Sequence, residues 1–209
     1  MQRALGDSML ARWERVSHWA AIKQQSKRAR RFRSFGASSA ICFPPAALFG
    51  ERYITVGAGT VIGPYSTLSA GVSPQHELGD VEVVRIGDRC LIGKGSGIVA
   101  HERVVIGDDV FTGHHVYITD ANHGYEDVTT PPGRQFAPSQ PVTIGDGAWI
   151  GHGAIVLPGA VVGRHTIVGA GSVVTGPLPD FCVAVGNPAR VIRRYVNGRW
   201  TAQPDAGDG

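Results

Sequence analysis

The chain has 209 residues, of which 43% are hydrophobic, with 29 Gly, 13 Pro and a formal net charge of +3. This composition suits one domain of turn-dense β structure and excludes collagen-like and low-complexity chains. No apolar run approaches the roughly 20 residues that cross a bilayer, and no hydrophobic secretion signal follows the first arginines. Three cysteines without metal or redox spacing fit a reducing compartment, so we expect a cytoplasmic protein.

The first part of the chain is basic and has a helical pattern. Residues 1–35 hold nine Lys/Arg against two Asp/Glu. Residues 8–35 contain no Gly or Pro and carry Leu10, Trp13 and Val16 at helical spacing, which predicts an α-helix over that range. Two interpretations stay open: peripheral contact with an anionic membrane surface or an acidic partner, or a solvated helix packed on the rest of the protein. Nucleic acid binding is not expected, because no binding motif is present.

A six-residue period dominates the second half of the chain. From Ile144 to Val168 the fourth residue after each aliphatic position is small, and the residue directly after the aliphatic one is usually Gly. A chain that turns a corner every six residues places one large and one small side chain inside each flat face. The period therefore predicts an all-β fold, a parallel β-helix solenoid with triangular coils and an N-terminal α-helix. The aliphatic positions are Ile144, Ile150, Val156, Val162, Val168 and Val174.

The same period begins at Val56 and is interrupted twice. Residues 73–83 break it, with Val72 expected at a small inward position, and Cys90 occupies such a position after the period returns. Residues 119–140 form an insertion too long for a corner, and loops of this length are often functional. The expected organisation is a basic helix with a capping lead-in over residues 1–53, the β-helix over 54–195, and a C-terminal tail over 196–209 that is expected to be disordered beyond Trp200.

His123 is the strongest candidate for a general base. It lies in the long loop, outside the six-residue register, close to Asp120. An imidazole can take a proton from a hydroxyl near neutral pH, and a nearby carboxylate or carbonyl fixes its tautomer. On position alone a loop histidine is more often simply an exposed residue, so His123 is at this point a candidate general base, with Asp120 as the candidate group that orients it.

Three segments carry a resemblance to a known family: ITDANHGYED, GDGAWIGHGAIVLPGAVVGRHTIVGAGSVVTGPLP and VAVGNPARVIRRY. With the repeats, they resemble the hexapeptide-repeat acyltransferases, and most of all the maltose, galactoside and lipopolysaccharide O-acetyltransferases. The resemblance implies a left-handed coil, a homotrimer, and an acyl-CoA donor, most often acetyl-CoA, bound between subunits. It also implies acyl transfer to a sugar or glycan hydroxyl by direct attack on the thioester, with no metal.

The resemblance also assigns roles to residues. The family's catalytic histidine falls on His123. This sequence has His152 where the family often has Ser or Asn, and Gly176 where it often has Lys, so donor contacts are expected to differ in detail. The family's sugar-binding positions find no convincing match, with His101 where an acidic residue is usual. The positions that the resemblance places along the donor are Gly113, Trp149, Gly151, His152, Ala170, Thr175, Arg190 and Arg193.

Other interpretations of these residues remain. Trp149 also suits a contact between subunits, the terminal arginines suit a solvated face, and any corner favours Gly. A zinc enzyme of the γ-carbonic-anhydrase type uses the same coil but pairs ligands five residues apart, and no two histidines here have that spacing. A non-catalytic scaffold is the third alternative, although a scaffold requires neither His123 nor a basic donor end.

Overall fold

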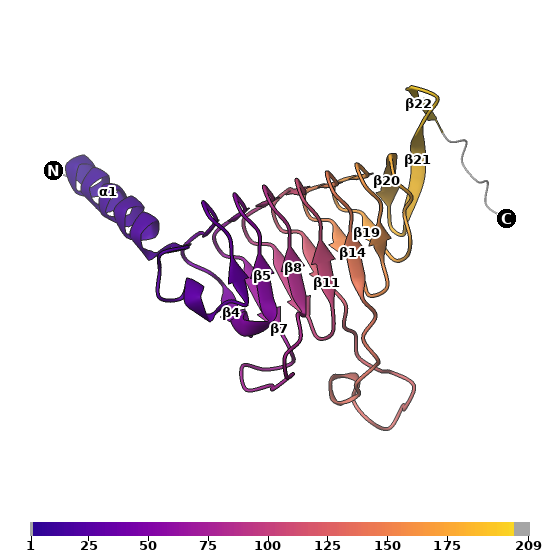
Figure 1. The fold of residues 1–209 in the computed structure, drawn as a ribbon, viewed down its shortest axis with the longest axis horizontal. Helices are drawn as coiled ribbons and strands as arrows, with labels where there is room; N and C mark the ends of the chain where they lie inside the picture. The colour runs from indigo at the N-terminus through magenta and orange to yellow at the C-terminus, as the bar shows by residue number, and fades with distance from the viewer. Residues whose placement is uncertain (1, 203–209) are drawn as a thin grey trace.

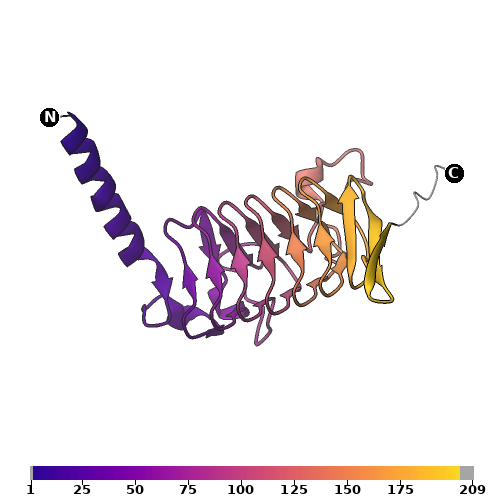
Figure 2. The same ribbon diagram turned by 90° about the horizontal axis from the view of Figure 1, so that it is seen from above.

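Short strands wound around a triangular prism make up most of the molecule (Figure 1). The structure is a computed structural model and describes residues 2–202. The helix α1 (Gln2–Ala20) projects from one end of the prism, and a β-hairpin extends from the other (Figure 2). Three short 3₁₀ turns are also present, η1 (Ala29–Arg31), η2 (Glu51–Tyr53) and η3 (Pro132–Arg134). No helix among the described residues is long and apolar enough to span a bilayer.

Each face of the prism is one sheet, and each coil contributes one strand to each sheet. Sheet 1 contains β1 (Ile22–Lys23), β3 (Ala40–Ile41), β6 (Val61–Ile62), β9 (Leu91–Ile92), β12 (Phe111–Thr112), β15 (Trp149–Ile150), β18 (Ile167–Val168), β20 (Cys182–Gly186), β21 (Ala189–Val196) and β22 (Arg199–Ala202). Sheet 2 contains β4 (Ala47–Phe49), β7 (Thr67–Ala70), β10 (Gly97–Ala100), β13 (Tyr117–Thr119), β16 (Ile155–Val156) and β19 (Val173–Val174). Sheet 3 contains β2 (Ser34–Phe35), β5 (Ile54–Val56), β8 (Val84–Ile86), β11 (Val104–Ile106), β14 (Val142–Ile144) and β17 (Val161–Val162).

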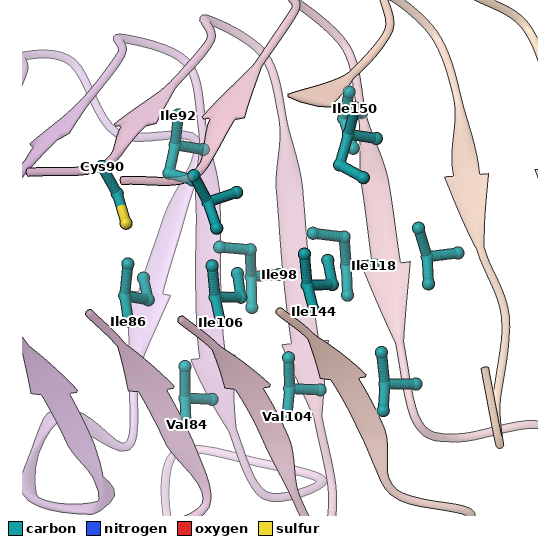
Figure 3. Packing of buried hydrophobic residues seen from close by; sticks show 14 of the residues in the cluster. Val84, Ile86, Cys90, Ile92, Ile98, Val104, Ile106, Ile118, Ile144 and Ile150 are labelled. Carbon is teal, nitrogen blue, oxygen red and sulfur yellow. The ribbon is translucent and has the colours of Figure 1, made fainter. Parts of the chain in front are cut away.

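The six-residue period sets the core. Equivalent aliphatic side chains of successive coils stack in rows along the prism, as Ile86, Ile106 and Ile144 do in Figure 3, and all three are fully buried. Parallel pairing in register, such as Ile106 opposite both Ile86 and Ile144, maintains the rows. The expected parallel β-helix with an N-terminal helix is therefore confirmed.

The inward polar groups are hydrogen-bonded. Thr112 replaces an aliphatic residue in its row, and its hydroxyl accepts from the Gly93 N–H at 2.9 Å and donates to the Gly113 carbonyl at 3.1 Å. Cys90 packs in a small position, as expected, with its Sγ 3.1 Å from the Gly107 carbonyl oxygen. Burial raises the pKa of the Cys90 thiol, so it has the character of a packing residue.

The N-terminal boundary differs from the prediction. The helix occupies residues 2–20 and ends well before residue 35, and the solenoid starts near residue 34 and not at 54. The apolar side chains of this segment are buried against the first coil and cover the end of the prism. They are Ile22, Ala29 and Phe32. The basic residues 27–33 therefore lie around η1 and not on the helix.

Two further positions differ from the prediction. Val72 is exposed, because the chain leaves its coil after Ala70 and the outward loop begins there. Residues 196–202 are not a tail: β22 pairs antiparallel with β21 as a hairpin. The rest of the predicted tail, 203–209, lies outside the described residues.

Candidate active site

The long loop leaves the prism at the edge between sheet 2 and sheet 3 and returns to the same place (Figure 1). The Gln140 N–H donates to the Asp120 carbonyl at 2.8 Å, which closes the neck of the loop. The Asp120 side chain is fully buried and its carboxylate accepts three backbone N–H groups of the preceding coil. These donors are the amides of His101, Glu102 and Arg103, at 2.8, 2.8 and 2.5 Å. The neck is thereby fixed to the coil beneath it.

These contacts correct the expected role of Asp120. Its carboxylate is occupied by backbone amides, and the hydrogen bond of the His123 ring goes elsewhere: Nδ1 lies 3.2 Å from the carbonyl oxygen of Gln135. Asp120 therefore positions the loop, whereas the Gln135 carbonyl orients the histidine. Every residue has a backbone carbonyl, so the sequence does not indicate which one contacts the His123 ring.

The geometry fixes the tautomer of His123. A carbonyl oxygen can only accept a hydrogen bond, so Nδ1 must carry the hydrogen in this contact. In the neutral ring, Nε2 then holds the free lone pair. No hydrogen bond from Nε2 to another atom of residues 2–202 occurs, and the side chain is exposed. His123 is thus arranged as a proton acceptor.

Gln135 also holds the loop together internally. Its main chain pairs with the strand-like segment at His123, where the Gly124 N–H donates to the Gln135 carbonyl at 3.1 Å. Its side-chain amide donates to the carbonyls of Asp127 and Thr130 at 2.8 and 2.6 Å. Hydrogen bonds from the hydroxyl and N–H of Thr129 lower the pKa of Asp127 to about 2, so this carboxylate is charged at neutral pH.

His123 lies between two hollows. The larger, of about 560 Å³, is formed by the loop together with Leu157, Pro158 and Thr175 of the following coils. The smaller, of about 350 Å³, lies over sheet 2 and is bordered by Tyr117 and His101. The expected donor residue Thr175 therefore shares a pocket with His123 in one chain. Other loop residues that line the larger hollow are Asn122, Tyr125, Glu126, Gln135, Phe136 and Gln140.

Four expected donor residues lie on a different edge, between sheet 1 and sheet 2. Gly113 and Gly151 occupy equivalent corners of adjacent coils, followed by His152 and Ala170. A Cβ on Gly113 would lie 2.6 Å from the backbone nitrogen of His152, and a Cβ on Gly151 would lie 2.5 Å from the backbone nitrogen of Ala170. Both glycines are therefore required by close backbone stacking, which leaves their role toward a donor as a prediction.

The His152 ring extends outward from that edge. It lies 6.1 Å from the ring of His114 and 5.6 Å from the ring of His115, measured between ring centroids. Within residues 2–202, no three His, Cys, Asp or Glu side chains of one chain gather as a set of metal ligands. The edge is therefore a row of imidazoles on the outside of the coil.

The remaining expected residues lie on the outer face of sheet 1 and its terminal hairpin. Trp149 is 48% exposed, with its ring 6.4 Å from that of Phe111 on the neighbouring strand. A hollow of about 450 Å³ joins Trp149 to Phe181, Tyr195 and Trp200, none of which sequence inspection identified; of these, Trp200 fell in the segment that was expected to be a tail. Arg190 and Arg193 lie exposed on β21 at the end of this sheet, and neither forms an ion pair within residues 2–202.

Comparisons with known proteins agree with this geometry. Residues 141–176 match the family model "bacterial transferase hexapeptide (six repeats)", and residues 83–119 match "hexapeptide repeat of succinyl-transferase". The galactoside O-acetyltransferase of Escherichia coli is 31% identical over 153 residues, which cover 73% of this chain and 69% of that protein. This chain belongs to the hexapeptide-repeat acyltransferases. The parallel β-helix is therefore left-handed, as the resemblance implied.

Two other matches are informative about this hexapeptide-repeat acyltransferase. A probable acetyltransferase of Mycobacterium tuberculosis is 37% identical over 140 residues, which cover 67% of this chain but only 44% of that protein. The structure of a mutant of AntD, an N-acyltransferase of Bacillus cereus bound to dTDP-4-amino-4,6-dideoxyglucose and coenzyme A, superposes with a TM-score of 0.70. It is 21% identical over 82% of this chain and 89% of that chain, so it supports the fold.

Replacement of Asp120 by Asn tests the neck of the loop. The amide keeps one acceptor oxygen but presents an NH₂ group to a backbone N–H, so we expect a loss of about 1–3 kcal/mol in the free energy of unfolding. Urea unfolding measures this loss, and limited proteolysis should show faster cleavage within residues 121–139. Glu126→Gln, which removes a charge from an exposed position of the same loop, is the control. Equal unfolding midpoints for the two variants would contradict the role of Asp120.

Proposed function

We propose that this chain is an acyl-CoA-dependent O-acyltransferase, with acetyl-CoA as the first donor to test and a sugar or glycan hydroxyl as acceptor. The observation that carries the proposal is the arrangement of His123, which borders two hollows and whose ring is oriented by the contact of Nδ1 with the Gln135 carbonyl. Family membership supports transfer chemistry, since the relatives are named acetyltransferases.

The reaction needs one base and two adjacent binding spaces. Nε2 of His123 takes the proton of the acceptor hydroxyl while that oxygen attacks the thioester carbonyl carbon. The tetrahedral intermediate collapses with cleavage of the C–S bond, and the thiolate of coenzyme A takes up the proton from the imidazolium. The Gln135 carbonyl favours the cation, because the Nδ1–H bond strengthens when the ring is positively charged. Transfer is direct, without an acyl-enzyme intermediate.

The placement of the expected donor residues supports a site shared between subunits. His123 and Thr175 lie at the edge between sheets 2 and 3, whereas His152 and Ala170 lie at the other edge of sheet 2. Trp149 faces outward from sheet 1. In a closed trimer, the first edge of one copy would face the second edge and sheet 1 of the next, and the donor would lie in the groove. Arg190 and Arg193 then suit the phosphates at its far end.

The lining of the larger hollow supports a sugar acceptor. Asn122, Glu126 and Gln140 offer hydrogen-bonding side chains, and the aromatic rings of Tyr125 and Phe136 are exposed beside them. A sugar presents hydroxyl groups at its rim and C–H groups on its faces, so mixed polar and aromatic walls suit it. One relative is named for galactoside acetylation, and AntD was crystallised with a nucleotide sugar.

His123→Ala tests the catalytic role. We expect release of free thiol from acetyl-CoA in the presence of a sugar acceptor to fall about 10²- to 10⁴-fold, because the general base is lost. Binding of coenzyme A, measured by calorimetry, should be retained. His76→Ala, which removes a histidine from the other outward loop, is the control. Unchanged thiol release by His123→Ala would contradict the mechanism.

Mixed oligomers test the shared site. His123→Ala and Trp149→Ala chains are each expected to be poorly active, whereas co-refolding them should restore about a quarter of the wild-type sites if both residues act across one trimer interface. Thiol release by the mixture measures the recovery. Activity of the mixture that does not exceed the mean of the two variants would place both residues in a single chain and contradict the shared site.

A further inference from the structure

Helix α1 carries an apolar stripe that stays largely exposed in the described part of the chain. Met9, Trp13 and Val16 recur at spacings of four and three residues, so they lie on one side of the helix. Met9 is 69% exposed, and the other two are also exposed. Within the described residues, the ring of Trp13 lies 6.1 Å from the ring of Phe43, measured between ring centroids. Because large apolar side chains are rarely left in such rows on a monomer surface, the stripe indicates a partner.

The border of the stripe is aromatic and basic. Trp19, the most exposed tryptophan at 79%, lies beside it in the last turn of α1. Arg12 and Arg15 lie seven and four residues before Trp19, so they are on the same side of the helix as that ring. Neither arginine forms an ion pair within residues 2–202. Tryptophan and long basic side chains at the edge of an apolar face are typical of helices that lie in the interface of a bilayer.

A cationic cluster, defined as Lys27, Arg30 and Arg31, lies at the same end of the prism. All three side chains are exposed and make no ion pair within the part of the chain that is described. The 3₁₀ turn η1, which carries Arg30 and Arg31 and follows Lys27, is anchored because Ala29 and Phe32 are buried against the first coil. The neighbouring arginines are already neutralised, Arg28 by Glu51 at 3.1 Å and Arg33 by Asp80 at 2.6 Å.

We propose that α1 and the cationic cluster form a peripheral binding surface for an anionic phospholipid bilayer. The apolar stripe inserts at the level of the acyl chains, Trp19 lies at the headgroups, and the cluster meets lipid phosphates. An acidic protein or nucleic acid would use the cations but not the stripe. A second copy of the chain would use the stripe but would bring two strongly basic segments together, since residues 1–35 hold nine basic side chains against two acidic ones.

Binding through this surface would orient the enzyme relative to the bilayer. The loop that carries His123 extends from the side of the prism, farther along its axis than α1 (Figure 1). A chain held by its N-terminal end therefore keeps this loop free to receive an acceptor near the bilayer. The proposal concerns location and does not depend on the identity of the reaction.

Flotation of the full chain with lipid vesicles tests the proposal. Wild-type protein should float with vesicles of phosphatidylcholine and phosphatidylglycerol, and remain in solution with phosphatidylcholine alone or in high salt. Met9→Ser with Trp19→Ser should lower binding about tenfold, because apolar area is lost from the stripe. Lys27→Glu with Arg30→Glu should abolish the preference for anionic lipid. Trp200→Ser, which removes an exposed tryptophan at the opposite end, should bind as the wild type does.

Two results would overturn the proposal. The first is equal flotation, or none, for wild type and both double variants, with circular dichroism showing that the variants keep the β-helix. The second is a change in oligomer mass of the Met9→Ser, Trp19→Ser variant in lipid-free solution. That change would assign the stripe to contact between copies of this chain.

Discussion

Backbone stacking between successive coils is the constraint on which the rest of this structure depends. The strands of successive coils pair with one another in register, so inward side chains must fit a row and corners must admit the neighbouring backbone. Gly113 shows the requirement on corners, because a Cβ at this position would lie 2.6 Å from the backbone nitrogen of His152. With the interior filled by aliphatic rows, polar chemistry is confined to faces, corners and the loops that leave them.

The candidate active site follows from that confinement. The long loop can carry a base only if it is held against the rigid stack, and the buried carboxylate of Asp120 does this by accepting three backbone amides of the preceding coil. The Gln135 carbonyl then selects the Nδ1–H tautomer of His123. The coil is thus rigid, the neck fixes the position of the loop, and the loop carries the candidate proton acceptor. The residues expected along the donor lie on the other edges of the prism, and we propose that a neighbouring subunit brings them to this loop.

The sequence predicted the features that depend on periodicity. Ile144 to Val174 occupy the inward rows because six residues make one side of every coil. It failed where tertiary contacts override local pattern: residues 22–35 look helical, but Ile22 and Phe32 close the end of the prism. It also failed where a partner is not a side chain, as with the Gln135 carbonyl. Asp120 was expected to orient His123, whereas its carboxylate accepts backbone amides of the preceding coil.

The measurement that tests this account most directly is the tautomeric state of His123. Nitrogen-15 NMR of uniformly labelled protein, with the signal assigned by comparison with His123→Ala, distinguishes a protonated ring nitrogen from a bare one. In the neutral ring we predict hydrogen on Nδ1 and a free Nε2, the state that can accept the proton of a hydroxyl. Hydrogen on Nε2 in the neutral ring would contradict the arrangement, because the nitrogen that is not hydrogen-bonded to the Gln135 carbonyl would then have no lone pair to offer.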